Sequence, residues 1–354
     1  MMLPICTIFP SFLSRLLSQR SQNLVLPLCS CVLLCLSLIG MAARPVSSLS
    51  FSSSTSNSPG ILEKTALVTG STDGIGLTTA KELASEGFRV IVHGRDPERI
   101  KKACAKVREA GGSFASAVPA MADISTLQGC ESLVETVNAA CLAKSTQLNL
   151  LVNNAGVFVE NSKETVQWDA NTVLERTFAV NVAAPFVITS LLLPLLTAKE
   201  GTRIVIASSI SQSGAINDWD DLQFEKRSFS NHRAYSESKL LDALLSMEMA
   251  ERLKFLGTNR VTCNCLDPGT VNTKMLLAGW GACGIDVDDA RDETWLSTSP
   301  DVKGKTGMYY VGRRERRASS PAYDQQVREM LWNVLSQLAP DAAKSWESLA
   351  DVTW

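Results

Sequence analysis

The sequence lacks the charge pattern of nucleic-acid-binding proteins. It carries 34 Lys and Arg against 36 Asp and Glu, a formal net charge of −2 at pH 7, and it contains no dense basic cluster with interleaved aromatic residues. Affinity for a polyphosphate backbone needs such a cluster, so no nucleic-acid partner is expected. The short basic run at 313–317 (Arg-Arg-Glu-Arg-Arg) is predicted to be a solvated surface loop.

Histidine is also scarce, with only His93 and His232, and the ten cysteines form no recognisable framework. Four of the cysteines fall in the N-terminal segment, and the others are scattered through apparent helices and strands, which argues against a disulfide scaffold. Cys263 and Cys265 share one face of an apolar strand, but no second cysteine pair stands at metal-binding spacing. The cysteines are therefore predicted to be reduced, and no metal site is expected.

Acidic residues are absent from residues 1–60, where arginines and a serine-rich stretch give a targeting composition. Within it, residues 24–43 form an uncharged, largely apolar run about long enough to cross a bilayer. Residues 41–60, in contrast, are typical of a plastid transit peptide that begins at Met41. A membrane anchor, a cleaved transit peptide and a disordered tail without an address all remain open, and the folded domain is predicted to comprise residues 61–354.

Beyond residue 60, short β-branched runs alternate with longer amphipathic segments, and no internal repeat interrupts them. This alternation predicts a single doubly wound, Rossmann-like α/β domain with a central parallel sheet and helices on both faces. The strands are expected at residues 65–68, 89–93, 113–118, 148–152, 203–207 and 260–266, and the first helices at 75–86, 97–110 and 125–143.

A glycine-rich turn follows the first expected strand and opens the first helix, with the sequence Thr-Gly-Ser-Thr-Asp-Gly-Ile-Gly at 69–76. In this context glycine permits a tight turn and close approach of the backbone to a pyrophosphate at the helix N-terminus. The residues predicted to contact the cofactor here are Gly70, Ser71, Thr72, Asp73, Gly74, Ile75 and Gly76.

A tyrosine and a lysine are spaced one helical turn apart in Tyr235-Ser-Glu-Ser-Lys239, so that both side chains share one face of a helix. Tyrosine normally ionises near pH 10, and a neighbouring ammonium group favours the tyrosinate form. This pair predicts general acid–base chemistry, with Tyr235 as the proton-transfer group.

Together, the T-G-x-x-x-G-I-G turn and the Tyr-x-x-x-Lys pair resemble the motifs of the short-chain dehydrogenase/reductase family, and the resemblance covers residues 61 to about 340. It implies that Ser209 orients the substrate oxygen, with Ser208 as the fallback, and that Asn181 relays protons to Lys239. It also implies cofactor contacts from Asn153, Ala155 and Gly156 after the fourth strand and from Pro268, Gly269, and Thr270 or Thr273 after the sixth.

The family selects its cofactor at the end of the second strand, where an acidic residue binds the adenosine ribose of NAD. At that position this sequence has Gly94, followed by Arg95, a cation suited to the 2′-phosphate of NADP. The resemblance therefore implies NADP(H) as cofactor. Asp123 and Ile124 correspond to the family residues beside the adenine.

Ser209 and Tyr235 are separated by about twice the usual family interval, and the inserted stretch at 216–226 is characteristic of retinol-dehydrogenase-like members and their plastid-envelope relatives. The implied function is hydride transfer between NADP(H) and a lipophilic carbonyl or alcohol. A non-catalytic NADPH sensor or scaffold at a membrane is the alternative interpretation. Neither the substrate nor the oligomeric state follows from the sequence.

Overall fold

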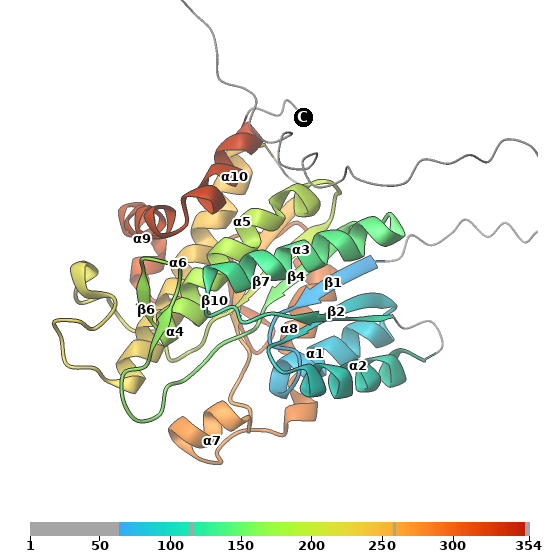
Figure 1. Ribbon diagram of the computed structural model, residues 1–354, viewed down its shortest axis with the longest axis horizontal. Helices are drawn as coiled ribbons and strands as arrows, with labels where there is room; N and C mark the ends of the chain where they lie inside the picture. The colour runs from blue at the N-terminus through green and yellow to red at the C-terminus, as the bar shows by residue number, and fades with distance from the viewer. Residues whose placement is uncertain (1–63, 113–115, 258–259, 351–354) are drawn as a thin grey trace, which may run out of the picture. The chain divides into compact units, whose positions relative to one another are not determined.

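We analysed a computed structural model of the chain, which describes residues 64–112, 116–257 and 260–350 (Figure 1). These residues belong to one compact unit, residues 58–354. The segment at 1–60, predicted to be a targeting sequence or an anchor, lies outside the described residues.

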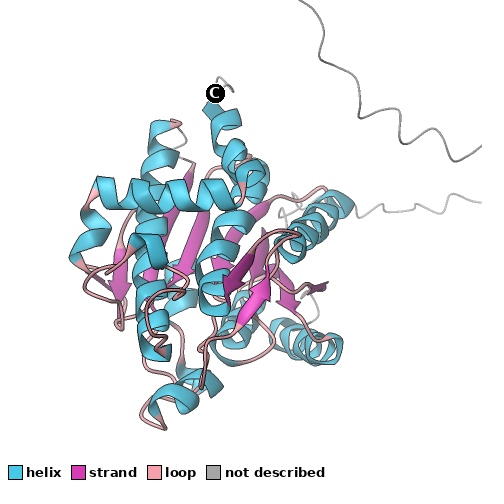
Figure 2. Ribbon diagram, turned by 60° about the vertical axis from the view of Figure 1, so that its left-hand side comes forward, coloured by secondary structure: helices cyan, strands magenta, loops and turns pink. Residues whose placement is uncertain are grey.

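A twisted central sheet of eight strands forms the middle layer of the domain (Figure 2), with the order β10-β9-β8-β7-β4-β1-β2-β3. All neighbouring pairs are parallel except β9 and β10. The strands are β1 (Lys64–Val68), β2 (Phe88–Gly94), β3 (Ala117–Met121), β4 (Leu148–Asn153), β7 (Thr202–Ala207), β8 (Val261–Asp267), β9 (Tyr309–Val311) and β10 (Arg314–Arg316).

Helices cover both faces of this sheet, which confirms the predicted doubly wound α/β fold (Figure 1). One face carries α1 (Gly74–Ser85), α2 (Pro97–Gly111) and α8 (Asp292–Thr298). The other face carries α3 (Leu127–Lys144), α5 (Ala184–Thr197) and α6 (Asn231–Phe255), with α9 (Gln325–Leu338) and α10 (Pro340–Ala350) packed outside them.

Alternation of side chains along the strands divides the apolar core in two. In β1, Leu67 packs in the core beneath α3 and α5, whereas Ala66 and Val68 pack in the core beneath α1 and α2. All three are fully buried. A parallel strand covered on both faces must be apolar at consecutive positions, and the sequence of β1 shows such a run.

Two sequence expectations need correction. The third strand spans Ala117–Met121 rather than 113–118, and it accommodates Pro119 because it lies at the edge of the sheet, where a missing backbone donor is tolerated. The basic run at 313–317 is not a loop, because Arg314–Arg316 form the exposed strand β10. A two-residue turn with positive φ at Gly312 and Arg313 joins β10 to β9, as favoured hairpins require.

Among the described residues, the helical segment Arg176–Thr197 is long and apolar enough to cross a membrane, yet 83% of its apolar window is buried inside the domain. It comprises α4 (Arg176–Phe178), a π-helical turn (Ala179–Ala183) and α5. Asn181 lies in the π-helical turn. Such turns commonly mark functional sites, because they reorient one side chain within a continuous helix.

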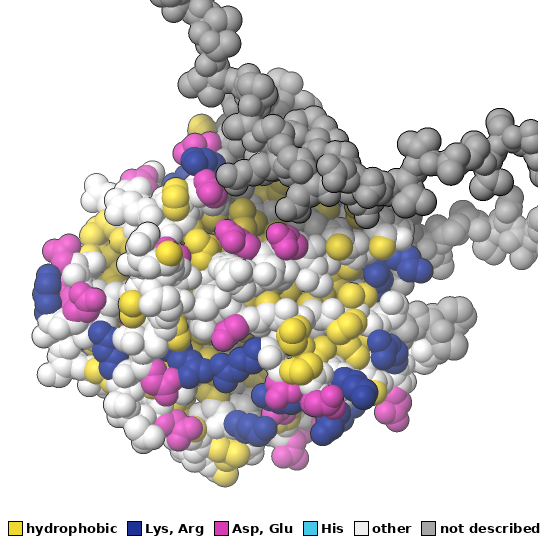
Figure 3. Space-filling model, viewed as in Figure 1, with side chains coloured by type: hydrophobic (Ala, Val, Ile, Leu, Met, Phe, Trp, Pro, Cys, Tyr) yellow, Lys and Arg dark blue, Asp and Glu magenta, His cyan; other side chains and the backbone are white. Residues whose placement is uncertain are grey.

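The remaining elements connect these layers. They are the hairpin β5 (Thr165–Gln167) and β6 (Val173–Glu175), helix α7 (Lys274–Trp280), and short 3₁₀ turns at Trp219–Asp221, Val287–Asp289, Pro300–Val302 and Ser320–Tyr323. Helix α7 stands apart from the layers at one edge of the domain (Figure 1). On the face seen in Figure 3, basic and acidic side chains are interspersed rather than segregated by sign.

Candidate active site

A cavity of about 590 Å³ lies at the carboxyl ends of β1, β2, β4, β7 and β8. Open α/β sheets bind ligands at this edge, where loops from neighbouring strands converge. Most of the residues predicted from the sequence line it, including Tyr235, Lys239, Ser209, Arg95 and the glycine-rich turn.

The glycine-rich turn approaches its neighbours too closely to accept side chains. A Cβ added at Gly76 would lie 2.3 Å from Asn154 Nδ2, and one added at Gly70, which also has a φ of +66°, would lie 3.0 Å from Ala155 Cα. Asp73 caps the N-terminus of α1 by accepting a hydrogen bond from the Gly74 N–H. The turn and the helix N-terminus therefore present backbone N–H groups to the cavity, as a pyrophosphate site requires.

Two residues predicted to contact the cofactor do not line the cavity. The Ser71 hydroxyl donates to Val68 O and accepts from the His93 N–H, which fastens the turn to β2. Asn153 points to the α5 side of the sheet, where its Nδ2 donates to Thr189 Oγ1 at 3.0 Å. The next residue, Asn154, lines the cavity instead.

Asn154 belongs to the Asn-Asn-Ala-Gly stretch at 153–156, which the family resemblance places at the cofactor pocket. Asn154 Nδ2 donates to Thr69 O at 2.7 Å, and the Asn154 N–H donates to Thr69 Oγ1. These bonds join the segment after β4 to the glycine-rich turn after β1. Successive residues of a strand point to opposite faces, so Asn153 and Asn154 could not both face the cofactor.

At the adenine end, the cavity is bordered by two arginines, Arg95 and Arg99, of which only Arg95 was predicted. A Cβ at Gly94 would lie 2.5 Å from Thr72 Cγ2, so Thr72 occupies the space that any larger residue at position 94 would need. Asp123 and Ile124 line the same end, and Asp123 Oδ1 accepts hydrogen bonds from the backbone and hydroxyl of Ser125.

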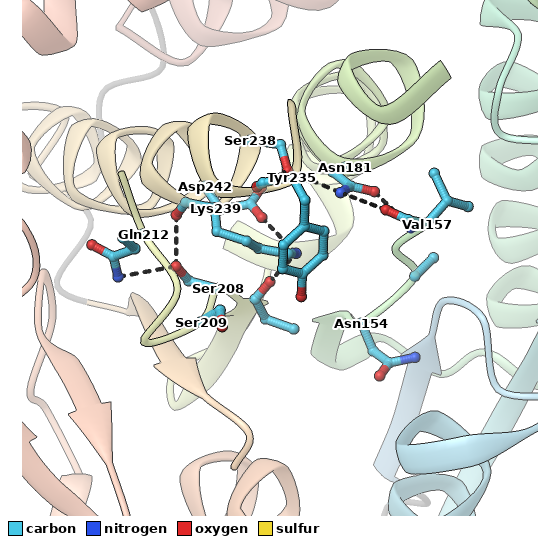
Figure 4. Close-up of polar contacts among 12 residues, drawn as sticks. Asn154, Val157, Asn181, Ser208, Ser209, Gln212, Tyr235, Ser238, Lys239 and Asp242 are labelled. Carbon is cyan, nitrogen blue, oxygen red and sulfur yellow. Dashed lines mark hydrogen bonds and ion pairs between the residues drawn. The ribbon is translucent and has the colours of Figure 1, made fainter. Parts of the chain in front are cut away.

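Tyr235 and Lys239 project together from the buried face of α6 (Figure 4). Lys239 Nζ lies 5.6 Å from the centre of the Tyr235 ring and donates to Ala207 O at 2.8 Å. Burial raises the pKa of Tyr235, whereas the Lys239 charge and a hydrogen bond with Ser209 lower it. The phenol and ammonium of the Tyr-x-x-x-Lys pair are therefore brought together with the hydroxyl at the end of β7.

The two serines at the end of β7 differ in their freedom to contact a ligand. The Ser208 hydroxyl donates a hydrogen bond to Lys239 O at 2.7 Å and accepts one from Gln212 Nε2 (Figure 4). Both of these hydrogen bonds are made within the protein. Ser209 is half-buried, and its Oγ accepts one bond from the Ser211 N–H. Of the two serines, Ser209 thus keeps more hydrogen-bonding capacity for a ligand.

Asn181 does not touch Lys239 directly. Its Oδ1 accepts from the Val157 N–H at 2.8 Å, and its Nδ2 donates to Val157 O and Ser238 Oγ. A Cβ at Gly156 would lie 3.5 Å from Asn181 Oδ1 and 3.7 Å from Lys239 Nζ. Because Gly156 has no side chain, a small space is left that both polar groups border.

An aromatic cluster, which the sequence reading did not find, surrounds the Tyr235 ring. It comprises Phe158, His232, Tyr235 and Trp280, and its neighbouring ring centres lie 5.0–5.9 Å apart. Trp280 ends α7 and is 40% exposed at the cavity mouth. The cluster could not be read from the sequence because its members come from three distant segments.

The segment after β8 supplies Pro268, Gly269, Thr270 and Thr273 to the cavity wall. Thr273 Oγ1 caps α7 by accepting from the Leu276 N–H. Lys274 Nζ lies 2.7 Å from Asp73 Oδ2, which also pairs with Arg99 at 3.2 Å. The hydrogen bond from Lys274 is the main reason that the pKa of Asp73 is lowered.

These features fit a dinucleotide. The glycine-rich turn and the α1 N-terminus would hold the pyrophosphate, Arg95 and Arg99 would neutralise a phosphate at the adenosine end, and Lys239 on the cavity wall would contact a ribose. Among the described residues, no group of His, Cys, Asp and Glu could hold a metal ion.

Comparison with known proteins identifies the family. Residues 64–279 match the family model described as short chain dehydrogenase. Mouse retinol dehydrogenase 14 is 34% identical over 78% of this chain and 86% of its own length, and human polyprenol dehydrogenase is 29% identical over 77% and 83%.

Among solved structures, a short chain dehydrogenase from Burkholderia cenocepacia in complex with NADP superposes with a TM-score of 0.53 at 25% identity, over 70% of this chain and 96% of that one. This complex agrees with the NADP(H) cofactor predicted from the sequence. The chain therefore belongs to the short-chain dehydrogenase family of oxidoreductases, in its retinol-dehydrogenase-like branch.

Proposed function

We propose that the protein transfers a hydride between NADP(H) and a carbonyl or alcohol group of a lipophilic substrate, with Tyr235 as the proton donor in reduction and the acceptor in oxidation. The observation that carries this proposal is the position of the Tyr235 phenol on the cavity wall beside Lys239 and Ser209. The bound cofactor supplies or accepts the hydride.

Each polar residue has a distinct role in this proposal. The Ser209 hydroxyl hydrogen-bonds the substrate oxygen and directs it toward Tyr235. The Lys239 ammonium stabilises tyrosinate and holds the nicotinamide ribose, and Asn181 borders the space through which Lys239 exchanges protons with water.

The lipophilic character of the substrate is inferred from one apolar part of the cavity wall. Val157, Ile210, Met275, Leu276 and Trp280 line this part of the cavity. These side chains are half-buried or exposed, so binding of an apolar ligand would remove their surface from water. The relatives are named for retinol and polyprenol, which are both lipophilic alcohols.

Activity is tested by following NADPH consumption with a panel of lipophilic aldehydes and ketones. Tyr235→Phe should abolish turnover because it removes the transferable proton. Tyr310→Phe is the matched control, since Tyr310 is buried in β9 and does not line the cavity. Undiminished turnover in Tyr235→Phe would contradict the mechanism, and tight NADPH binding without turnover on any member of the panel would support the sensor alternative.

We further propose that NADPH is preferred over NADH. Thr72 fills the space where an acidic residue would select NAD, and the exposed Arg95 stands next to it. Arg95→Ala should weaken NADPH binding about tenfold to a hundredfold, because charge-assisted hydrogen bonds contribute about 1.5–3 kcal/mol. NADH binding should not change, nor should NADPH binding in Lys101→Ala, a nearby exposed cation outside the cavity wall. Equal affinity of the unmodified protein for both cofactors would refute the preference.

For residues 1–60 we propose a targeting or anchoring role, as a plastid transit peptide or a membrane anchor. A fluorescent fusion of these residues would report the destination. Carbonate extraction would then separate an imported, extractable protein from an anchored one. Diffuse fluorescence throughout the cell would contradict both roles.

A further inference from the structure

A buried carboxylate stands next to Lys239 in the candidate active site. Lys239 Nζ donates to Asp242 Oδ2 at 2.9 Å, one turn further along α6 (Figure 4). Their side chains are 5% and 1% exposed. Neither the tyrosine–lysine spacing nor the other sequence motifs pointed to this residue.

Two of the three N–H groups of the Lys239 ammonium donate hydrogen bonds within the protein, one to Asp242 and one to Ala207 O. Asp242 in turn depends on Lys239, because its Oδ1 has no hydrogen-bond partner among the described residues. An isolated carboxylate at this depth would be strongly destabilised, so its charge persists through the ion pair.

Other titratable groups surround the pair from several elements. Tyr235 belongs to α6, Cys265 and Asp267 to β8, and Glu293 to α8. The charges of Asp242 and Asp267 raise the pKa of Tyr235 and oppose the lowering effect of Lys239. Burial raises the pKa of Cys265, so its thiol is neutral near pH 7, and burial raises the pKa of Glu293 to about 7.

We propose that Asp242 is a positioning residue whose carboxylate holds the Lys239 ammonium, offsets its charge and thereby keeps Tyr235 in the protonated form. The inference rests on the proposed role of Tyr235 as the proton-transfer group. A protonated phenol is the form that reduction of a carbonyl requires. Together with burial, Asp242 therefore stabilises the protonation state in which Tyr235 can donate to a carbonyl oxygen.

The direct test is a spectroscopic titration of the tyrosines in the full-length protein. The chain has four tyrosines. The ionisation of Tyr235 is obtained by subtracting the ultraviolet titration of Tyr235→Phe, and the same subtraction is made in an Asp242→Asn background. Removing the carboxylate charge should lower the ionisation midpoint of Tyr235 by about one pH unit. An unchanged midpoint in a folded Asp242→Asn protein would overturn the proposal.

Two controls separate charge from structure. Asp242→Glu retains the carboxylate and should keep the midpoint near that of the unmodified protein. Glu248→Gln removes another buried carboxylate of α6, one that pairs with Arg252 and Arg328 instead, and should not move the midpoint.

A second neutral variant, Asp242→Leu, replaces Asp242→Asn in the titration if the buried asparagine amide prevents folding. Both neutral variants should shift the midpoint in the same direction. Loss of folding in both of them would assign Asp242 a purely structural role and would contradict the proposal.

The titration needs neither cofactor nor substrate, so its outcome is independent of whether turnover is found. If the substrate panel yields a substrate, the alkaline limb of the reduction profile should move to lower pH in Asp242→Asn by the same amount as the midpoint. A shifted midpoint without any turnover would count against the proposed function and not against the role of Asp242.

Discussion

The backbone N–H of Gly70 donates a 3.0 Å hydrogen bond to Nδ1 of His93. His93 Nε2 lies 3.2 Å from Ala122 O, so this nitrogen carries the proton of the neutral ring. The imidazole thus ties the glycine-rich turn after β1 to the segment after β3. Burial lowers the pKa of His93 to about 4, which keeps the ring neutral at physiological pH.

Replacing His93 should weaken the fold near neutral pH and make the remaining stability less sensitive to acid. His93→Leu leaves the Gly70 N–H and Ala122 O without this partner, and we expect a loss of about 1–3 kcal/mol in the free energy of unfolding. The pKa of His93 lies below the ordinary 6.5, so its contribution is complete above pH 6.5 and is lost as the pH falls toward 4. Urea unfolding across this range should show a smaller pH dependence in the variant, and an equal dependence would contradict this role.

Glu293 should produce the opposite pH dependence. It is fully buried on α8, and Oε2 accepts a 3.0 Å bond from Thr79 Oγ1. Burial raises its pKa from 4.5 to about 7, so its contribution to stability is present below pH 4.5 and is lost as the pH rises through about 7.

Glu293→Gln cannot ionise, so it should remove this loss and raise the melting temperature relative to the unmodified protein above about pH 8. Thermal unfolding at several pH values measures the effect. The control is Glu109→Gln, at an exposed position of α2. Parallel melting curves for the unmodified protein and Glu293→Gln at every pH would refute the assignment.

A methyl group at Gly76 should disrupt the glycine-rich turn. The added Cβ would lie 2.3 Å from Asn154 Nδ2 and 2.7 Å from Gly70 O, so the turn has to shift. We expect Gly76→Ala to cost about 1–3 kcal/mol of stability and to weaken NADPH binding. In the described part of the chain no atom lies within 4 Å of a Cβ added at Gly214, so Gly214→Ala should leave both quantities unchanged in calorimetric and binding measurements.

Removing the Trp280 ring should affect the substrate more than the cofactor. The ring centre lies 5.5 Å from that of Tyr235 and 5.0 Å from that of Phe158. Loss of aromatic contacts and apolar area predicts that Trp280→Ala raises the KM for a lipophilic carbonyl about tenfold, while the Kd for NADPH stays constant. Leu277→Ala, an exposed change on the same helix, should alter neither, and an unchanged KM in Trp280→Ala would exclude Trp280 from the substrate wall.

The strand pattern of the sequence was sufficient to predict the parallel sheet, because β1, β2, β4, β7 and β8 are rich in apolar and β-branched residues. The predicted boundaries of these strands agree with the observed ones to within one residue. The hairpin β9–β10 escaped notice because its strands have three residues each, too few to show a periodicity. The predicted range of the edge strand β3 ended too early because Pro119 interrupts the apolar pattern.

In the candidate site, too, the sequence predicts what depends on neighbouring residues and not what depends on distant ones. The glycine-rich turn and the Tyr235–Lys239 pair could be predicted because their chemistry depends on residues close in sequence, where turn and helix geometry fix the spacing. The hydrogen bonds of Asn154 and the ring contacts of Tyr235 could not be predicted, since they join distant segments.

The sequence by itself thus determined the strand–helix alternation, the dinucleotide turn and the catalytic spacing, all of which follow from local backbone geometry. The tertiary structure alone decided which side chains share one low-dielectric space. It buries Asp242 against Lys239, sets Thr72 against Gly94 and encloses Glu293. These decisions depend on which strands are neighbours and how much water the packing excludes, and neither is encoded in the spacing of residues along the chain.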